Sequence, residues 1–208
     1  MLETFFLHPE DYITAMQKPF DYVLTSNRYF ADNKNWLWYP HGGSWIDFSL
    51  WGLHEKKKDV SLILSEKKSM RGHQLRHGIV ERFGSLITDL YGYEDKRIRK
   101  FDGVAPYRFS VIIESEKAPG FFNEKLIDCF SVGTIPIYWG CTDLERFFDL
   151  DGVVEVESFE DVKGALESAN DHAYKTFIKS AKVNLELAKN YRISEDWIYQ
   201  NYPFLFRS

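Results

Sequence analysis

Three stretches of the sequence are apolar at most positions and are bounded by polar residues. They are DVSLILS at 59–65, YRFSVIIES at 107–115 and TIPIYWG at 134–140. A strand that is exposed on one face alternates apolar and polar residues, whereas a strand buried on both faces is apolar almost throughout. We therefore predict three strands in the interior of a parallel sheet.

Segments of helical spacing separate these strands. Helices are predicted at 73–87, at 159–170 and, after Gly120, up to Gly133, with a short helix at 143–148 and further strands at 88–93 and 152–157. This alternation is typical of a parallel sheet covered by helices on both faces, so we predict an α/β, Rossmann-like fold. Two more helices follow at 172–190 and 194–202. The first has an apolar face formed by Phe177, Ile178, Ala181, Leu185 and Ala188.

The first 55 residues are less regular. FDYVLTS (20–26) and NWLWYP (35–40) predict two short strands, and PHGGSW (40–45) predicts a glycine turn at the end of the second. The charged loop HEKKKD (54–59) is the weak boundary. We predict a linker-like segment, residues 1–55, that packs on a main domain, residues 56–208.

Composition places the chain among compact globular proteins. It has 208 residues, of which 44% are hydrophobic and 17% aromatic, with a net charge of −5 and a pI near 5.7. This balance provides no basic surface for nucleic acid, and the run Lys56–Lys58 is interpreted as a solvated loop.

The sequence also bears on the compartment. Cys129 and Cys141 lack the spacing of a metal site or a disulfide framework, so we expect no metal, a reducing compartment and a cytoplasmic location. The N-terminus does not have the pattern of a signal peptide, and no apolar run reaches the length of a membrane span.

The stretch GFFNEKLIDCFSVGTIPIYWG (120–140) contains the first candidate site. Asn123 is a good N-cap, yet Lys125 lies in the first helical turn, where the helix dipole disfavours a cation by about 0.3–1 kcal/mol. A bound anion would reverse that effect. Since the preceding strand ends in Glu114 and Ser115, we expect these two residues, Asn123, Glu124 and Lys125 to meet in one crevice. Taken alone, a first-turn lysine beside a glutamate is more often a solvated pair.

A second candidate follows the strand at 59–65. RGHQLRHGIVERF (71–83) begins a helix at the same edge of the sheet as Lys125, because the carboxyl ends of parallel strands lie together. Arg71, His73 and Arg76 would add donors for an anion, Arg76 in bidentate fashion. The competing interpretation is that Arg76 and His77 only cover the helix surface.

Other motifs carry less weight. Asp149 and Asp151 match an Asp-x-Asp metal pattern, but such short matches are frequent by chance. Tyr138 ends a buried strand and is expected in the core or the pocket wall. The chain has neither GxGxxG nor GxxxxGK[ST], which argues against a dehydrogenase or a P-loop enzyme.

The segment ESEKAPGFFNEKLIDCFSVGTIPIYWG (114–140) resembles the donor-binding signature of the fucosyltransferase-type glycosyltransferases of family 10. That signature runs Glu-Asn-Ser, a short loop, Tyr-x-Thr-Glu-Lys-Leu, a Gly-Thr-(Ile/Val)-Pro strand and a Trp-Gly ending. Weaker similarity extends through 72–76, 143–158 and 195–202, and the segments 20–26 and 40–45 are similar to the linker that enters the donor domain.

The resemblance implies the C-terminal, donor-binding half of a GT-B glycosyltransferase with two Rossmann-like domains. It implies GDP-fucose or a related GDP-sugar as donor, a glycan as acceptor, inversion at the anomeric carbon and no obligatory metal or cofactor. By matching position, Lys125 and Arg76 would hold the diphosphate. Glu124 would bind the ribose, and Glu114 the sugar or its binding loop. Ser115 and Asn123 join this ribose and sugar group, with His73, Arg71, Phe121 and Tyr138 as additional candidates.

The chain departs from the family pattern at three positions of the signature. Ser115 replaces an asparagine, Phe121 a tyrosine and Asn123 a threonine. About 55 residues precede the donor domain, fewer than an acceptor domain needs, so the sequence nominates no catalytic base.

Two alternatives to a complete transferase therefore stay open. The chain could be a nucleotide-sugar-binding module without transfer, or one that depends on an oligomer or a partner chain for the acceptor site. It could also be an unrelated Rossmann-like protein that binds another anion.

Overall fold

The fold is described from a computed structural model for residues 8–92 and 98–206. A five-stranded sheet forms its centre, with all neighbouring strands parallel and the order β4-β3-β5-β6-β7. Its strands are β3 (Lys58–Ile63), β4 (Asp89–Tyr91), β5 (Tyr107–Ile113), β6 (Ile135–Trp139) and β7 (Val154–Glu155). The α/β prediction is confirmed, and β3, β5 and β6 are the three apolar strands.

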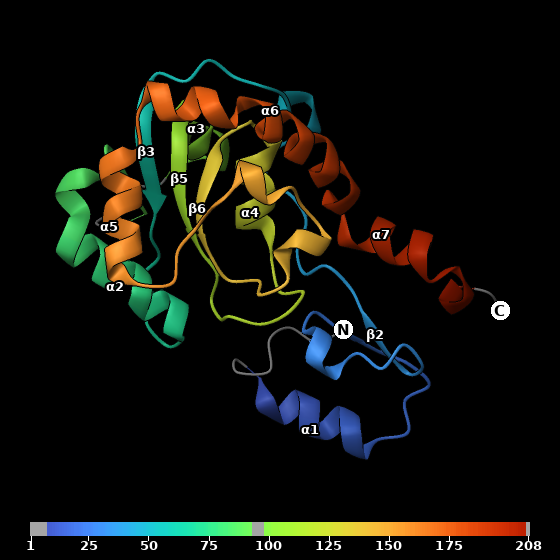
Figure 1. Cartoon of the computed structure of the whole chain (residues 1–208). Coiled ribbons are helices and arrows are strands. Elements are labelled where there is room, and N and C mark those ends of the chain that lie inside the picture. Colours follow the sequence, from blue (N-terminus) through green and yellow to red (C-terminus); the bar gives the residue numbers. More distant parts are fainter. Residues whose placement is uncertain (1–7, 93–97, 207–208) are drawn as a thin grey trace.

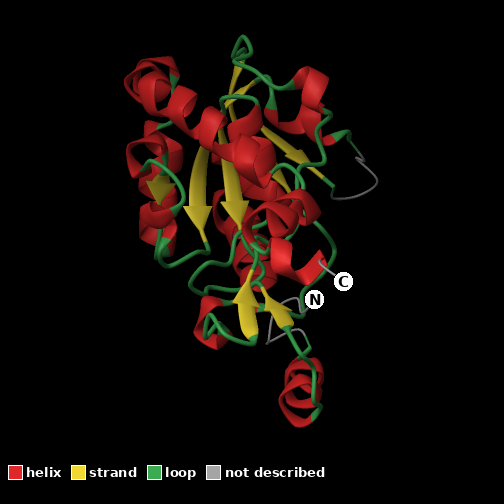
Figure 2. Cartoon of the chain, turned by 90° about the vertical axis from the view of Figure 1, so that its right-hand side faces the viewer, coloured by secondary structure: helices red, strands yellow, loops and turns green. Residues whose placement is uncertain are grey.

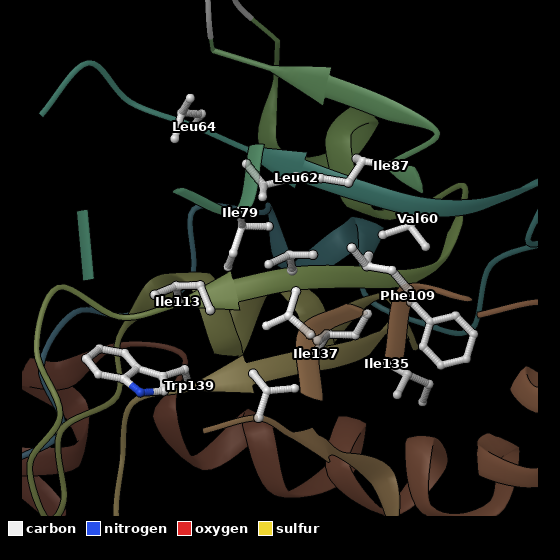
Figure 3. Close-up of a cluster of buried hydrophobic side chains, with 14 of the residues drawn as sticks. Val60, Leu62, Leu64, Ile79, Ile87, Phe109, Ile113, Ile135, Ile137 and Trp139 are labelled. Carbon is white, nitrogen blue, oxygen red and sulfur yellow. The ribbon is translucent and has the colours of Figure 1, made fainter. Parts of the chain in front are cut away.

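Helices cover both faces of this sheet (Figure 1). On one face, α2 (Arg71–Phe83) and α5 (Phe159–Ser168) pack on a core that includes Ile79, Ile113 and Ile137 (Figure 3). On the other face lie α3 (Lys100–Val104) and α4 (Glu124–Ser131). The long helix α6 (Asp171–Ala188) packs on α4, β5 and β6 along the face predicted from its sequence.

The α3 and α4 face has small polar residues at its centre. Ser61 and Ser110 are paired in register on β3 and β5, and their hydroxyl oxygens lie 3.0 Å apart. Their neighbours Val60, Leu62, Phe109 and Val111 point to the opposite face, because successive side chains of a strand alternate. The two serines therefore leave space above the sheet where bulky residues would fill it.

The N-terminal segment forms a separate small unit that lies beside the main sheet (Figure 2). It contains α1 (Pro9–Gln17) and the two-stranded parallel sheet of β1 (Val23–Thr25) and β2 (Trp36–Trp38). Both strands were predicted. Trp38 contacts the main domain, where its indole Nε1 donates to the carbonyl of Gly120 at 3.2 Å. The last helix, α7 (Ser194–Asn201), returns to this region, and Tyr202 donates to the carbonyl of Trp38 at 2.7 Å.

Several local predictions were wrong. Helices α1 and α3 were not predicted, and the segment 143–148 contains a three-residue 3-10 turn, Leu144–Arg146, in place of an α-helix. Of the predicted strand 152–157, only Val154–Glu155 forms a strand. Position 93, the end of another predicted strand, lies outside the described residues, as do residues 1–7 of the N-terminal sequence interpreted above.

The solvated loop predicted at Lys56–Lys58 is wrong at Lys56. Its ammonium donates to the carbonyls of Ala105 and Val132 and to the Thr134 hydroxyl, at 2.7–2.9 Å. Burial lowers the pKa of Lys56 to about 7. One lysine of the three is therefore structural. Its ammonium supplies the donor that the backbone carbonyls at the ends of α3 and α4 need.

No helix in the described part of the chain is both long and apolar enough to cross a membrane.

Candidate functional site

The first turn of α4 holds the central polar cluster. Asn123 caps the helix, as predicted, since its Oδ1 accepts from the backbone N–H of Lys125 at 3.1 Å. The same oxygen accepts from Lys125 Nζ at 2.9 Å, and Glu124 lies 3.7 Å from that ammonium. Gly133, with φ of 68°, follows the helix in the left-handed conformation that glycine adopts most easily.

Glu114 explains why a lysine is tolerated at this helix start. Its carboxylate is fully buried at the end of β5, accepts from Lys125 Nζ at 3.1 Å and accepts from the backbone N–H of Asn123 at 3.2 Å. Burial raises the pKa of Glu114, and the Lys125 ammonium opposes that rise. The solvated-pair interpretation of Lys125 is therefore wrong, because its charge is matched to a buried carboxylate.

Helix α2 reaches the same place through a close backbone contact. Gly72 N–H donates to the Ser115 carbonyl at 3.0 Å, and a Cβ at Gly72 would lie 1.7 Å from the Glu114 carbonyl oxygen. Only glycine fits this contact, and the contact sets the first turn of α2 against the end of β5. This arrangement places His73 and Arg76 at the cavity wall.

His73 is neutral and has a defined tautomer. Its Nδ1 accepts from the Met70 backbone N–H at 3.2 Å, which leaves the proton on Nε2. Burial, together with the positive charges of Arg76 and Lys67, lowers the pKa of His73 to about 4. An Nε2–H donor in this position suits an anionic ligand.

Arg76 is the most unusual cation of the cluster. The residue is 5% exposed, and its Nε has no hydrogen-bond partner among the described residues. Burial lowers the pKa of Arg76, whereas the carboxylates of Glu114 and Glu124 raise it. A buried guanidinium N–H that lacks an acceptor is costly unless a ligand supplies one.

These elements enclose a cavity of about 520 Å³ at the carboxyl edge of the sheet, above Ser110. Seven of the predicted site residues line it: His73, Arg76, Ser115, Phe121, Asn123, Glu124 and Lys125. The fold therefore brings most of the predicted site residues to one cavity.

Three predicted residues lie elsewhere. Glu114 stays behind Lys125 as its buried counterion. The Arg71 guanidinium lies 5.5 Å from the centre of the Trp139 ring, so the structure does not bring it to the cavity. Tyr138 is buried and does not line the cavity, and its hydroxyl accepts from the Cys141 N–H at 2.9 Å.

Several other residues of the cavity were not predicted as site residues, among them His41, Trp45, Lys100 and Asp128. The ring of His41 stacks on Phe121, with centroids 6.4 Å apart, although its segment was interpreted only as a turn. Asp128 could have been found from sequence, because it lies four residues after Glu124 and thus on the same helix face. Trp45 belongs to the same turn segment as His41, and Lys100 comes from a segment for which no element was predicted.

The cavity carries no arrangement suited to a metal. In the described ranges, three or more His, Cys, Asp or Glu side chains nowhere form a group that could hold an ion, and Cys129 and Cys141 are free thiols.

Fold and cavity together define a Rossmann-like domain with a buried arginine and two half-buried lysines at the carboxyl edge of a parallel sheet, where such domains bind ligands. Residues 53–192 match the model of glycosyltransferase family 10 (fucosyltransferase), C-terminal region, and the chain belongs to that family. This confirms the resemblance and removes the alternative of an unrelated Rossmann-like protein.

Known proteins show the same relationship. The α-(1,3)-fucosyltransferase FucT of Helicobacter pylori is 25% identical over 144 residues, which are 59% of this chain and 30% of that protein. A solved α1,3-fucosyltransferase structure with GDP shares the fold at a TM-score of 0.50 and 19% identity, over 66% of this chain and 47% of its own. The α1,3-fucosyltransferase structure with GDP-fucose has a TM-score of 0.50 and 18% identity, over 66% of this chain and 48% of its own. The chain thus spans less than half the length of these relatives.

Proposed function

We propose that the cavity binds a GDP-sugar, with GDP-fucose as donor, and that the chain serves transfer of the sugar to a glycan with inversion at the anomeric carbon. The observation that carries this proposal is the buried Arg76, whose Nε lacks an acceptor, in one cavity with Lys125. A diphosphate supplies several anionic oxygens, and a guanidinium binds such groups in bidentate fashion. Membership of the fucosyltransferase family supports the same ligand class.

Each polar group of the cavity has a role in this proposal. Arg76 and Lys125 bind the diphosphate and stabilise the negative charge that develops as it leaves. His73 adds a neutral Nε2–H donor, and Glu124 accepts from the ribose hydroxyls. Asn123, with Glu114 behind it, holds Lys125 in place for the phosphates.

Two of the positions that depart from the family pattern lie at the cavity wall. Phe121 is buried at the cavity wall and has no hydroxyl, so it contributes shape, together with the stacked ring of His41. Ser115 lines the cavity and offers a hydroxyl where the family has an amide. We assign these two residues to the sugar end of the donor.

The reaction would be a direct displacement. An acceptor hydroxyl attacks the anomeric carbon, a base takes its proton, and the nucleoside diphosphate leaves from the opposite face. We assign no residue of this chain to the base.

We also propose the division into a segment 1–55 that packs on a donor domain 56–208. Three contacts support it. Trp38 donates to Gly120, the Ser44 hydroxyl donates to Asp128 at 2.7 Å, and Arg28 forms an ion pair with Asp143.

A second candidate function is a nucleotide-sugar-binding module that transfers sugar only with a partner chain or within an oligomer. The observation in its favour is that the matching family model, over residues 53–192, is that of the family's C-terminal region. Transfer of fucose by the isolated chain to any glycan would exclude it, whereas GDP binding without transfer or donor hydrolysis would favour it.

A thermal-shift panel of GDP, UDP, CMP and GDP-fucose tests the donor class. A ligand that binds only the folded state raises stability in proportion to RT ln(1 + [L]/Kd). We expect GDP and GDP-fucose to raise the melting temperature more than UDP or CMP. Equal or absent shifts for all four would reject a GDP-sugar donor.

A further inference from the structure

The part of the cavity formed by α3, α4 and the segment after β2 contains a second set of polar groups. Trp45, Lys100 and Asp128 meet there: the Lys100 ammonium lies 5.1 Å from the centre of the Trp45 ring, and Asp128 Oδ1 accepts from the Trp45 N–H at 2.8 Å. Asp128 lies one helical turn beyond Glu124, a displacement of roughly 5–6 Å along α4.

Asp128 uses only one of its two oxygens within the protein. Oδ1 accepts from the Ser44 hydroxyl at 2.7 Å and from the N–H groups of Trp45 and Ile46. Oδ2 has no partner among the described residues, although the residue is 1% exposed and lines the cavity. A buried carboxylate oxygen without a donor is destabilising, and a ligand N–H would satisfy it.

Lys100 adds the complementary group. Its ammonium is within electrostatic reach of Asp128 and Glu124 and lines the same cavity. This part of the cavity wall therefore contains an acceptor that lacks a donor, Asp128 Oδ2, and a donor, Lys100 Nζ, beside the aromatic ring of Trp45. The aromatic ring of Trp45 also provides a stacking surface for a planar base.

The bases differ in what they offer to such a pair. Guanine carries the O6 acceptor, the N1–H donor and the 2-amino donor along one edge. Adenine presents an amino donor beside an unprotonated ring nitrogen, and uracil lacks the amino group. The 2-amino group is thus the feature that a carboxylate acceptor selects.

We propose that Asp128 and Lys100 form the guanine subsite of the donor cavity, with Asp128 Oδ2 accepting from the 2-amino group and N1–H and Lys100 donating to O6. This inference rests on the proposed function and adds the residues that choose the base. The phosphate cluster at Arg76 and Lys125 does not distinguish one nucleoside diphosphate from another. Selection for guanine therefore needs groups elsewhere in the cavity, and Asp128 and Lys100 provide them.

Calorimetric titration of wild-type protein with GDP and with IDP, which lacks only the 2-amino group, is the direct test. A hydrogen bond to a charged acceptor predicts that GDP binds about tenfold to hundredfold more tightly than IDP. Equal affinities would overturn the subsite while leaving the diphosphate site intact. If neither ligand binds, the proposed function fails and the subsite fails with it.

The Asp128→Asn variant separates base recognition from a structural effect. Its amide oxygen can keep the contacts to Ser44 and Trp45, whereas its NH2 group replaces Oδ2. We expect this variant to bind GDP and IDP with about equal affinity. Loss of both affinities by the same factor would mean that Asp128 only holds the segment 44–46 and would overturn the proposal. Lys100→Met should weaken GDP and IDP equally, because both carry O6, and exposed Lys163→Met on α5 is the matched control. If a variant does not fold, the wild-type comparison decides.

Discussion

Lys125 Nζ lies 3.1 Å from Oε2 of Glu114, and this ion pair joins a fully buried carboxylate to a cavity wall. The pair links stability to ligand binding, because the same ammonium neutralises Glu114 and faces the space where a diphosphate would lie. A lysine in the first turn of a helix is thereby favoured by its surroundings despite the helix dipole.

Removing one partner of this pair should cost stability. Lys125→Met leaves Glu114 buried without its counterion, and we expect a loss of about 3–5 kcal/mol in the free energy of unfolding, measured by urea denaturation. The double variant Glu114→Gln/Lys125→Met should recover much of that loss. Its affinity for GDP should nevertheless stay about 1.5–3 kcal/mol weaker than that of the wild type, by calorimetry. Full recovery of GDP affinity would remove Lys125 from the diphosphate site.

His73 should report the arrival of an anion. Its pKa is lowered to about 4 by burial and by neighbouring cations, so the ring is neutral at pH 7. A bound diphosphate supplies negative charge close to the ring and should raise this pKa. NMR titration of the imidazole resonances with and without GDP measures the change. An unchanged pKa at saturating GDP would place the phosphates elsewhere.

Gly72 should tolerate no side chain. Gly72→Ala puts a Cβ 1.7 Å from the Glu114 carbonyl oxygen, so α2 must move away from β5. We expect a loss of more than about 3 kcal/mol in unfolding free energy and a weaker diphosphate site. Gly164→Ala is the matched control. That glycine is exposed within α5. Apart from its chain neighbours and the backbone of its own helix, no heavy atom lies within 4 Å of the added Cβ, so the change should stabilise by about 0.4–1 kcal/mol. Similar effects of both substitutions would contradict the close contact.

Lys56 should give the stability a distinct pH dependence. Burial lowers its folded pKa from 10.5 to about 7, so the unfolded chain binds more protons between these values. Stability therefore rises with pH across pH 7–10.5, and the cost of burying the charge is complete below pH 7. Lys56→Met should lack this contribution, so the difference in unfolding free energy between the two proteins should change across the window. A constant difference would show that Lys56 stays protonated.

The sequence was sufficient to predict the sheet and the start of α4, because three long apolar strands and one capped helix carry strong local signals. Because the carboxyl ends of parallel strands lie at one edge of the sheet, the sequence also predicted that Arg76 and Lys125 lie close together. The positions of Lys56, Lys100 and Asp128 depend instead on tertiary contacts: a buried lysine and a half-paired carboxylate have no periodicity of their own. Helix α1 was missed because only Tyr12 and Ala15 of its nine residues are buried, too few to form an apolar stripe along the helix.

The central claim is that buried Arg76 holds the diphosphate of a GDP-sugar, and calorimetric titration with GDP of the variants Arg76→Met and Arg82→Met tests it most directly. Both arginines belong to α2, but Arg82 is exposed and lies over the Phe159 ring, away from the cavity. We predict that Arg76→Met weakens GDP binding at least tenfold, which corresponds to about 1.4 kcal/mol, while Arg82→Met binds as the wild type does. Equal GDP affinity for all three folded proteins would contradict the account.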